Sequence, residues 1–290
     1  EIIQNLLLLE DKLSLSESDF NTEKIFNQIC HQLLNWAVEN NINGNLWSSY
    51  ILFLISHNHN PYSLNSEQQG TNLNQSLRAA AQHDLEILQD LYQLSLSKIA
   101  AESNFDTAQY ISDFATNSDS NYSSLNKLAE IFNNSTTNLV KKVSAYYFEH
   151  GTGKLGHYKA FHWHHDQGLK EVPDPDPITF EQLIGYQQQQ KKLIANTESF
   201  LAGHQANNAL LVGDSGTGKS SSIKALMNKY HHHGLRLVEL AKHQMKDLPD
   251  LLEILKDRGL YFIIFMDDLS FEDFEVDYKY LKAVLEGGLE

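Results

Sequence analysis

The sequence predicts an α/β fold, a parallel sheet flanked by helices, which follows an all-helical N-terminal region. Apolar residues recur at helical spacing over residues 1–145, whereas short apolar segments alternate with helical ones after residue 178. Between these regions, residues 166–178 hold three of the five prolines, which favours an extended, hydrated connector. We therefore expect a helical domain over 1–145, a connector over 146–177 and an α/β domain over 178–290.

The N-terminal region divides into several predicted helices. Thr22 is the expected N-cap of one of them, and the apolar residues that follow keep the spacing of a single buried face as far as Ala37. Residues 57–75 are polar and contain a proline and a glycine, which predicts a loop. Further helices are expected over 46–55, 77–92, 108–114 and 125–132.

The segments after the connector alternate between strand and helix. The fully apolar segment 260–266 is typical of a strand that is buried on both faces of a parallel sheet. Further strands are predicted over 209–212 and 235–240, and helices over 219–232, 251–255 and 278–285.

A glycine-rich motif lies between the predicted strand 209–212 and the predicted helix 219–232. Residues 213–220 read Gly-Asp-Ser-Gly-Thr-Gly-Lys-Ser and match G-x-x-x-x-G-K-[ST] at every fixed position. Average residue frequencies give roughly 0.01 accidental matches in a chain of this length. The motif in this context predicts a phosphate-binding loop (P-loop), and with it the P-loop NTPase fold.

Each residue type in the motif has a physical role. Glycines permit a tight bend whose main-chain N–H groups form a nest for anions, and the first turn of the next helix adds further donors. Lys219 supplies a positive charge for the β- and γ-phosphates, and the Ser220 hydroxyl can ligate Mg²⁺. The expected phosphate-binding residues are Asp214, Ser215, Gly216, Thr217, Gly218, Lys219, Ser220 and Ser221.

An acidic pair, Asp267 and Asp268, ends the last predicted strand in the Walker B pattern. Asp267 is predicted to hold Mg²⁺ together with Ser220. Asp268 then takes the position of the carboxylate that polarises the attacking water, so Lys219 and Asp268 are the predicted catalytic residues. Two alternatives stay open: the pair only solvates or caps the end of the strand, or Glu272 activates water in place of the shorter Asp268.

Charge and cysteine content narrow the function classes. The 290 residues carry 22 basic and 37 acidic side chains, and the resulting net charge of −15 argues against nucleic-acid binding through a basic face. No apolar run approaches the ~18 residues of a membrane helix. The single cysteine, Cys30, forms no internal disulfide, which indicates a reducing compartment and a cytoplasmic protein.

Two further patterns are interpreted as structural. Residues 151–154 repeat Gly-Thr-Gly-Lys, but Leu155 stands where the motif needs Ser or Thr. The histidines within 157–165 and 231–233 lack the spacing of a metal site.

Residues 178–290 resemble an uncharacterised family of predicted bacterial AAA+ ATPases, catalogued as a domain of unknown function. The resemblance covers a little under half of the chain, and the approach to the ATPase domain fits it as well. The segments that carry it are 158–163, 183–186, 206–211, 247–250, 266–272 and 280–288.

The resemblance implies a nucleotide and an assembly. Ile184 and Gly185 match the segment that packs against adenine, so the nucleotide would be ATP, and the paired aspartates usual in this family support Asp268 as the water activator. The family relation also implies a homo-oligomer in which a neighbouring subunit supplies an arginine finger. The sensor strand, the arginine finger and the helical lid would follow Glu290, so we expect a C-terminally truncated fragment.

The predicted function is an ATPase of the AAA+ type. ATP binding and Mg²⁺-dependent hydrolysis would drive the remodelling of a macromolecular partner, and the sequence names no client for the helical domain. One alternative is a nucleotide-dependent switch or adaptor with little turnover, because Asp268 is one methylene shorter than the usual glutamate. Another is a phosphotransferase, for which the sequence shows no acceptor-binding motif.

Overall fold

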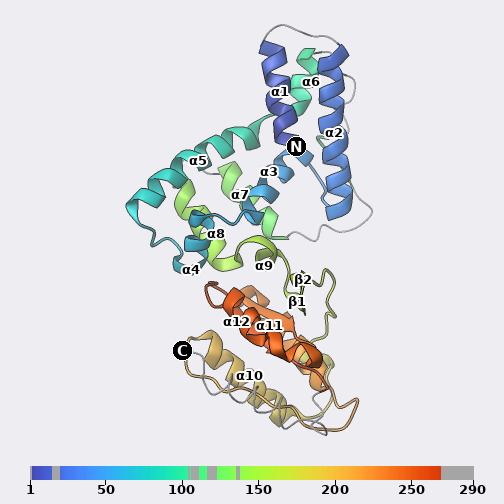
Figure 1. The fold of residues 1–290 in the computed structure, drawn as a ribbon, viewed down its shortest axis with the longest axis vertical. Helices are drawn as coiled ribbons and strands as arrows, with labels where there is room; N and C mark the ends of the chain where they lie inside the picture. Colours follow the sequence, from blue (N-terminus) through green and yellow to red (C-terminus); the bar gives the residue numbers. More distant parts are fainter. Residues whose placement is uncertain are drawn as a thin grey trace. The chain divides into compact units, whose positions relative to one another are not determined.

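The computed structural model describes residues 2–14, 20–103, 105, 111–115, 123–134 and 138–268 (Figure 1). Glu272 and the helix expected over 278–285 lie outside these residues. The chain divides into two compact units. The first holds Glu1–Asn58 and Leu73–Tyr146, and the second holds His59–Asn72 and Tyr147–Glu290.

The first unit is helical, as the sequence predicts. No helix among the described residues is long and apolar enough to cross a bilayer. Its helices are α1 (Ile2–Ser14), α2 (Phe20–Asn40), α3 (Leu46–His57), α5 (Gln75–Gln93), α6 (Leu96–Ser103) and α7 (Ser123–Asn134), and α8 (Leu139–His150) crosses into the second unit.

Apolar faces and caps explain these helices. Phe26, Ile29 and Leu33 recur on one side of α2, which contacts α1, and are fully buried. The Asn45 side chain accepts a hydrogen bond from Ser48 N and so caps α3. Thr22, the expected cap, instead lies inside the first turn of α2.

One predicted helix of this unit is wrong over its described part. Residues 111–114, expected to be helical, form a turn that ends in a β-bridge. Phe114 and Gly44 exchange main-chain hydrogen bonds of 3.0 and 2.7 Å, and Leu46 N donates to Ile111 O at 2.9 Å. These long-range partners replace the local bonds of a helix.

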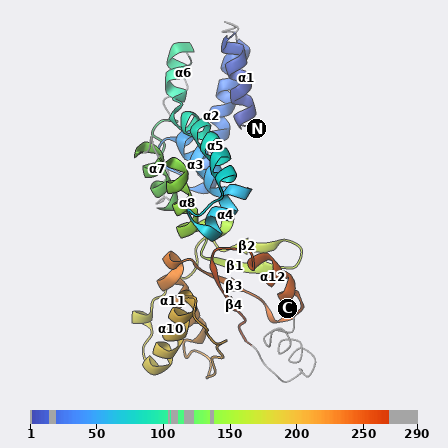
Figure 2. The ribbon, with the colours of Figure 1, turned by 90° about the vertical axis from the view of Figure 1, so that its left-hand side faces the viewer.

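The second unit contains a four-stranded sheet in the order β2-β1-β3-β4 (Figure 2). β3 pairs in parallel with both β1 and β4, and β2 pairs with β1 in the antiparallel sense. The strands are β1 (Ala160–His164), β2 (Gly168–Glu171), β3 (Leu235–Glu239) and β4 (Tyr261–Phe265).

The sheet is therefore mixed, and the prediction of a parallel sheet is wrong for one strand. Only the three-residue turn 165–167 joins β1 to β2, and so short a connection reverses the chain. Both strands lie within 146–177, the interval expected to be a connector.

The strand expected over 209–212 is absent, although its pattern is strand-like. Leu210 and Val212 are 68% and 85% exposed, while Leu211 between them packs against the core. Alternation of this kind is typical of a strand, but a strand also needs a hydrogen-bonded neighbour. Among the described residues no strand of the sheet pairs with this segment, so it forms no regular secondary structure.

Helices cover both faces of the sheet, as Figure 2 shows for α10 and α11 on one side and α12 on the other. The helical elements of this unit are α4 (Pro61–Gln69), α9 (Gly153–His157), η2 (Phe180–Gln182), α10 (Gln187–Leu201), α11 (Lys219–Tyr230), η3 (His231–His233), η4 (Lys242–Asp247) and α12 (Leu248–Leu255).

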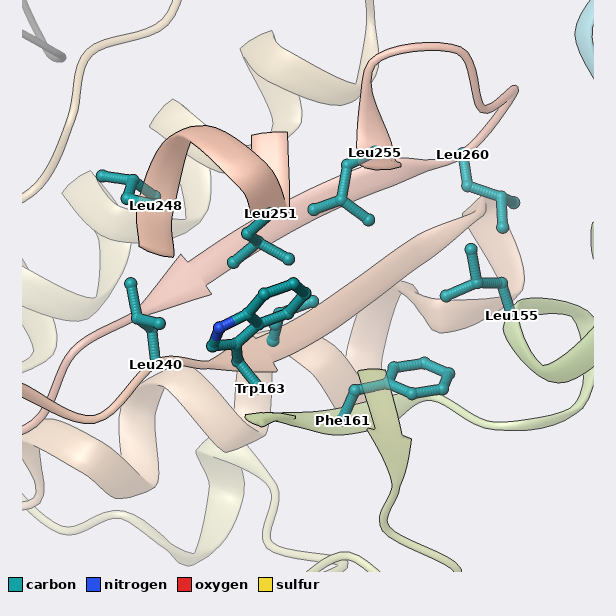
Figure 3. Packing of buried hydrophobic residues seen from close by; sticks show 9 residues of the cluster. Leu155, Phe161, Trp163, Leu240, Leu248, Leu251, Leu255 and Leu260 are labelled. Carbon is teal, nitrogen blue, oxygen red and sulfur yellow. The ribbon is translucent and has the colours of Figure 1, made fainter. Parts of the chain in front are cut away.

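Two apolar cores lie between these layers. Figure 3 shows the first, where side chains of β1 and α12 meet on one face of the sheet. The second lies on the opposite face, between the sheet and α10 and α11. The first consists of Leu155, Phe161, Trp163, Val238, Leu240, Leu248, Leu251, Leu255 and Leu260, and the second of Ala160, Leu193, Ile223, Leu226, Met227, Tyr230, Leu235 and Leu237.

α4 corrects the loop expected over 57–75. Asn60 and Ser63 form a capping box, in which Ser63 N donates to Asn60 Oδ1 at 2.9 Å and Asn60 N donates to Ser63 Oγ at 3.0 Å. Pro61 occupies the first position of the helix, where its missing N–H does no harm. The proline that suggested a loop is thus part of a helix start.

Candidate functional site

The glycine-rich motif forms a bend that leads into α11. Gly216 and Gly218 have φ angles of +79° and +81°, which a side chain would make unfavourable. Gly218 is the N-cap of α11 and provides no side-chain cap, so the first amides of this helix keep no intrahelical partner. Such a helix start attracts anions.

The Lys219 side chain folds back onto the bend and binds its carbonyl groups. Its Nζ donates hydrogen bonds of 2.8 Å to the carbonyl oxygens of both Gly213 and Asp214. Thr217 Oγ1 donates to the same Asp214 oxygen at 2.8 Å. Within the described part of the chain, Lys219 forms no ion pair with the carboxylates at 267–268. Its ammonium group instead contacts carbonyl oxygens of its own loop.

Ser220 and Asp267 meet, although they lie far apart in the sequence. Ser220 Oγ donates to Asp267 Oδ2 at 2.7 Å across a separation of 47 residues. β4 delivers Asp267 to this position, because the strand ends two residues earlier, beside the start of α11. The two predicted Mg²⁺ ligands therefore form one oxygen-rich pair.

Asp268 adopts a different arrangement from its neighbour. Its φ angle is +50°, in the left-handed region, and its main-chain N–H donates to Asp267 Oδ1 at 3.0 Å. Asp267 thus accepts hydrogen bonds at both carboxylate oxygens, and both aspartates are exposed after the end of the strand.

The donor set suits a small, hard cation. A hydroxyl and a carboxylate are oxygen ligands of the kind that Mg²⁺ prefers, and Mg²⁺ takes its other ligands from water and phosphate. No group of three His, Cys, Asp or Glu side chains gathers as a metal site in the described part of the chain. The Ser220–Asp267 pair therefore fits Mg²⁺ bound with a phosphate ligand.

The segment 183–186 lies beside the glycine-rich bend. A Cβ at Gly218 would stand 3.8 Å from Leu183 Cδ2, which places these two residues in contact. Ile184, predicted to contact adenine, is 97% exposed, and Gly185 beside it has a φ angle of +88°. An exposed apolar side chain here could be covered by a planar base.

Two sets of side-chain hydrogen bonds beside the glycine-rich bend were not predicted from the sequence. One is made by Gln190 and the other by Asn196. Gln190 Nε2 donates to Leu183 O at 3.4 Å and to Gly185 O at 3.0 Å, so the helix α10 fixes the 183–185 turn. Asn196 and Asn207 exchange hydrogen bonds of 2.8 and 3.0 Å, which hold the chain that enters the loop. Gln190 ends a run of four glutamines that reads as a solvated helix face, so no local signal marks it.

The remaining predicted residues lie along the same bend. Asp214, Ser215 and Gly216 are exposed, whereas Thr217, Gly218, Lys219, Ser220 and Ser221 are partly buried. The similar Gly-Thr-Gly-Lys stretch at 151–154 does not resemble this bend. Thr152 N and Oγ1 both donate to the Glu67 carboxylate, at 2.7 and 2.9 Å, so an acidic side chain occupies that turn.

Comparison with known proteins gives one match. Residues 156–290 match the model of a family described as a protein of unknown function (DUF815). No curated protein and no solved structure matches the chain. The matched range includes the four strands of the described residues, the glycine-rich motif and the acidic pair. Just under half of this chain therefore carries the sequence pattern of an uncharacterised domain family, the protein of unknown function DUF815.

Proposed function

We propose that this chain is an ATP-binding protein of the AAA+ type, which hydrolyses ATP with Mg²⁺ and uses the reaction to remodel a macromolecular partner. The 2.7 Å contact between Ser220 Oγ and Asp267 Oδ2 carries the proposal. It joins the end of the phosphate motif to the end of the acidic strand. The single buried cysteine, Cys30, supports a reducing, cytoplasmic setting.

The residues of the site have separate proposed roles in binding the nucleotide, the metal ion and the attacking water. Main-chain amides of 214–219 and the Lys219 ammonium would bind the phosphates, and Ile184 and Gly185 would take the adenine. Ser220 and Asp267 would hold Mg²⁺, which supplies positive charge to the phosphate oxygens when bound. Asp268 would orient a water molecule in line with the γ-phosphate and accept its proton.

Nucleotide binding tests this proposal directly. Titration of the protein with a fluorescent ATP analogue in the presence of Mg²⁺ should show saturable binding, and Lys219→Ala should weaken it at least tenfold because the phosphates lose their charged partner. Lys191→Ala, which removes an exposed lysine of α10, is the matched control and should bind like the wild type. Equal affinities for the wild type and Lys219→Ala would remove the proposed role of the loop.

A second candidate function is a nucleotide-dependent switch with little turnover. The Asp268 side chain favours this candidate, because it is one methylene shorter than glutamate and reaches less far toward a water molecule. Phosphate release separates the two functions. Turnover that falls at least tenfold in Asp268→Asn supports the ATPase, whereas tight binding without release in either protein supports the switch.

The proposed function includes assembly of several copies. An arginine finger from a neighbouring subunit would complete each site in an AAA+ arrangement. Light scattering during size-exclusion chromatography, with and without MgATP, measures this. A mass that stays monomeric in both conditions would remove the oligomer from the proposal.

A further inference from the structure

The Glu67 carboxylate on α4 is fully buried in the second unit. Arg258 donates to it twice, from Nε to Oε1 and from Nη2 to Oε2, each at 2.6 Å. Thr152 donates to Oε2 from N and from Oγ1, and Gly259 N donates to Oε1 at 3.0 Å. Five donors satisfy this carboxylate, and removing it would leave the Arg258 side chain, which is only 10% exposed, without its carboxylate partner.

α4 also touches the turn before β4 through the main chain. A Cβ at Gly259 would overlap the carbonyl oxygen of Glu67, so only glycine permits this approach. Next to it, Gln68 Nε2 donates to Asp257 O. α4 therefore holds the turn 257–259 by side-chain and backbone contacts together.

β4 connects this turn to the phosphate loop. The strand begins two residues after Gly259 and ends two residues before Asp267, which accepts the Ser220 hydroxyl. β4 pairs with β3 along its whole length, and a paired strand is stiff. β4 is thus the direct structural link between the turn 257–259 and Asp267.

The chain joins α4 closely to the first unit. Residues 58–60 lead from α3 to α4, and residues 70–74 lead from α4 to α5. α3 and α5 contact each other within the first unit. Both connections are short, so they form the covalent path from α4 to these two helices.

We propose that α4 transmits the nucleotide state of the phosphate loop to the helical unit, with Glu67 as the positioning residue. The inference rests on the proposed function, because it requires a nucleotide at the Ser220–Asp267 pair. Phosphate and Mg²⁺ would separate the Ser220 hydroxyl from Asp267, β4 would carry the shift to the turn 257–259, and Glu67 would pass it to α4.

Hydrogen–deuterium exchange of the full chain, with and without saturating MgATP, tests the inference. In the wild type, MgATP should change the exchange of amides in α3 and α5 at least twofold. In Glu67→Gln this change should be lost, while affinity for a fluorescent ATP analogue stays within about threefold of the wild-type value. A purely structural role for Glu67 would instead lower the affinity by more than this. Glu171→Gln is the matched control. Glu171 lies on β2 and forms an ion pair with Lys154, and this variant should keep the exchange change in α3 and α5.

The outcomes separate the two proposals. A wild type that does not bind the nucleotide removes the proposed function and this inference with it. If the wild type binds the nucleotide but the exchange of α3 and α5 does not change, only the inference is overturned. The inference is also overturned if the exchange in Glu67→Gln changes as it does in the wild type. If Glu67→Gln does not fold, Gln68→Ala takes its place, because it removes only an exposed donor to the same turn. It should reduce the response at least twofold, and an unchanged response overturns the inference.

Discussion

The Ser220 hydroxyl links two parts of the candidate site that the sequence separates by 47 residues. We predict that Ser220→Ala abolishes the Mg²⁺ dependence of ATP binding, because the variant loses one of the two protein oxygens that we propose as Mg²⁺ ligands. Affinity for a fluorescent ATP analogue should then be the same in Mg²⁺ and in EDTA.

Ser222→Ala is the control for this prediction. Its hydroxyl donates to Gly218 O, within the first turn of α11, at 2.7 Å, and does not reach Asp267. Ser222→Ala should retain the Mg²⁺ dependence of the wild type. Dependence that persists in Ser220→Ala would show that the metal is held elsewhere.

Glu67 makes the stability of the protein depend on pH. Burial raises the pKa of this carboxyl, but hydrogen bonds from Arg258, Gly259 and Thr152 and the charge of Arg258 outweigh burial, so the pKa lies below its ordinary value of 4.5. A lowered pKa in the folded state contributes stability that is present above pH 4.5 and is lost as pH falls through the folded-state pKa.

We therefore predict that the free energy of unfolding falls more steeply with acid in the wild type than in Glu67→Gln. Urea denaturation at a series of pH values from neutral to below 4.5 measures both slopes. Parallel curves for the two proteins would mean that another carboxylate governs the acid transition.

At the scale of elements, α4 begins with a cap that can be tested alone. Asn60→Ala removes the side-chain acceptor for Ser63 N and should lower the free energy of unfolding by about 1 kcal/mol. Asn60→Ser, which preserves a capping oxygen, should lose much less. Chemical denaturation of the three proteins gives the comparison, and equal losses for both variants would point to a role of Asn60 other than capping.

Elements with a regular pattern could be predicted from the sequence, and those fixed by distant partners could not. The helices α2, α3 and α5 and the strands β3 and β4 follow apolar periodicity and fall where it predicts them. β1 escaped prediction because histidines at 162 and 164 occupy one of its faces and interrupt the apolar pattern. The segment 209–212 has the right pattern but no neighbouring strand among the described residues.

The candidate site divides in the same way. The phosphate motif fixes the bend through local glycine conformations, so the sequence alone locates it. The hydrogen bonds made by Gln190 and Asn196 depend on side chains that meet carbonyl groups across a fold, and polar residues of this kind carry no periodic signal. Their contribution becomes visible only in three dimensions.

At the scale of the molecule, the second unit is built from two stretches of chain. Residues 59–72 belong to it, although residues on either side of them belong to the first unit. A fragment that starts at residue 147 therefore lacks α4, and Arg258 loses its carboxylate partner.

We predict that the fragment 147–290 is less stable than the second unit of the full chain by about 3–5 kcal/mol, the usual effect of breaking a buried ion pair. Denaturation monitored by tryptophan fluorescence measures this, because Trp163 lies in the core between β1 and α12. Full stability of the fragment would show that α4 contributes nothing to the unit.

Because the second unit is built from two separate stretches of chain, its parts are synthesised at different times. Glu67 leaves the ribosome 191 residues ahead of Arg258, the partner that neutralises it. At about 5–20 residues per second, this delay is roughly 10–40 s. During that time α4 has been synthesised, but the turn 257–259 that it contacts has not yet been translated. The Glu67–Arg258 contact can thus form only after Arg258 has been translated, and slowing the ribosome between these two positions would prolong the interval in which a chaperone can capture the nascent chain.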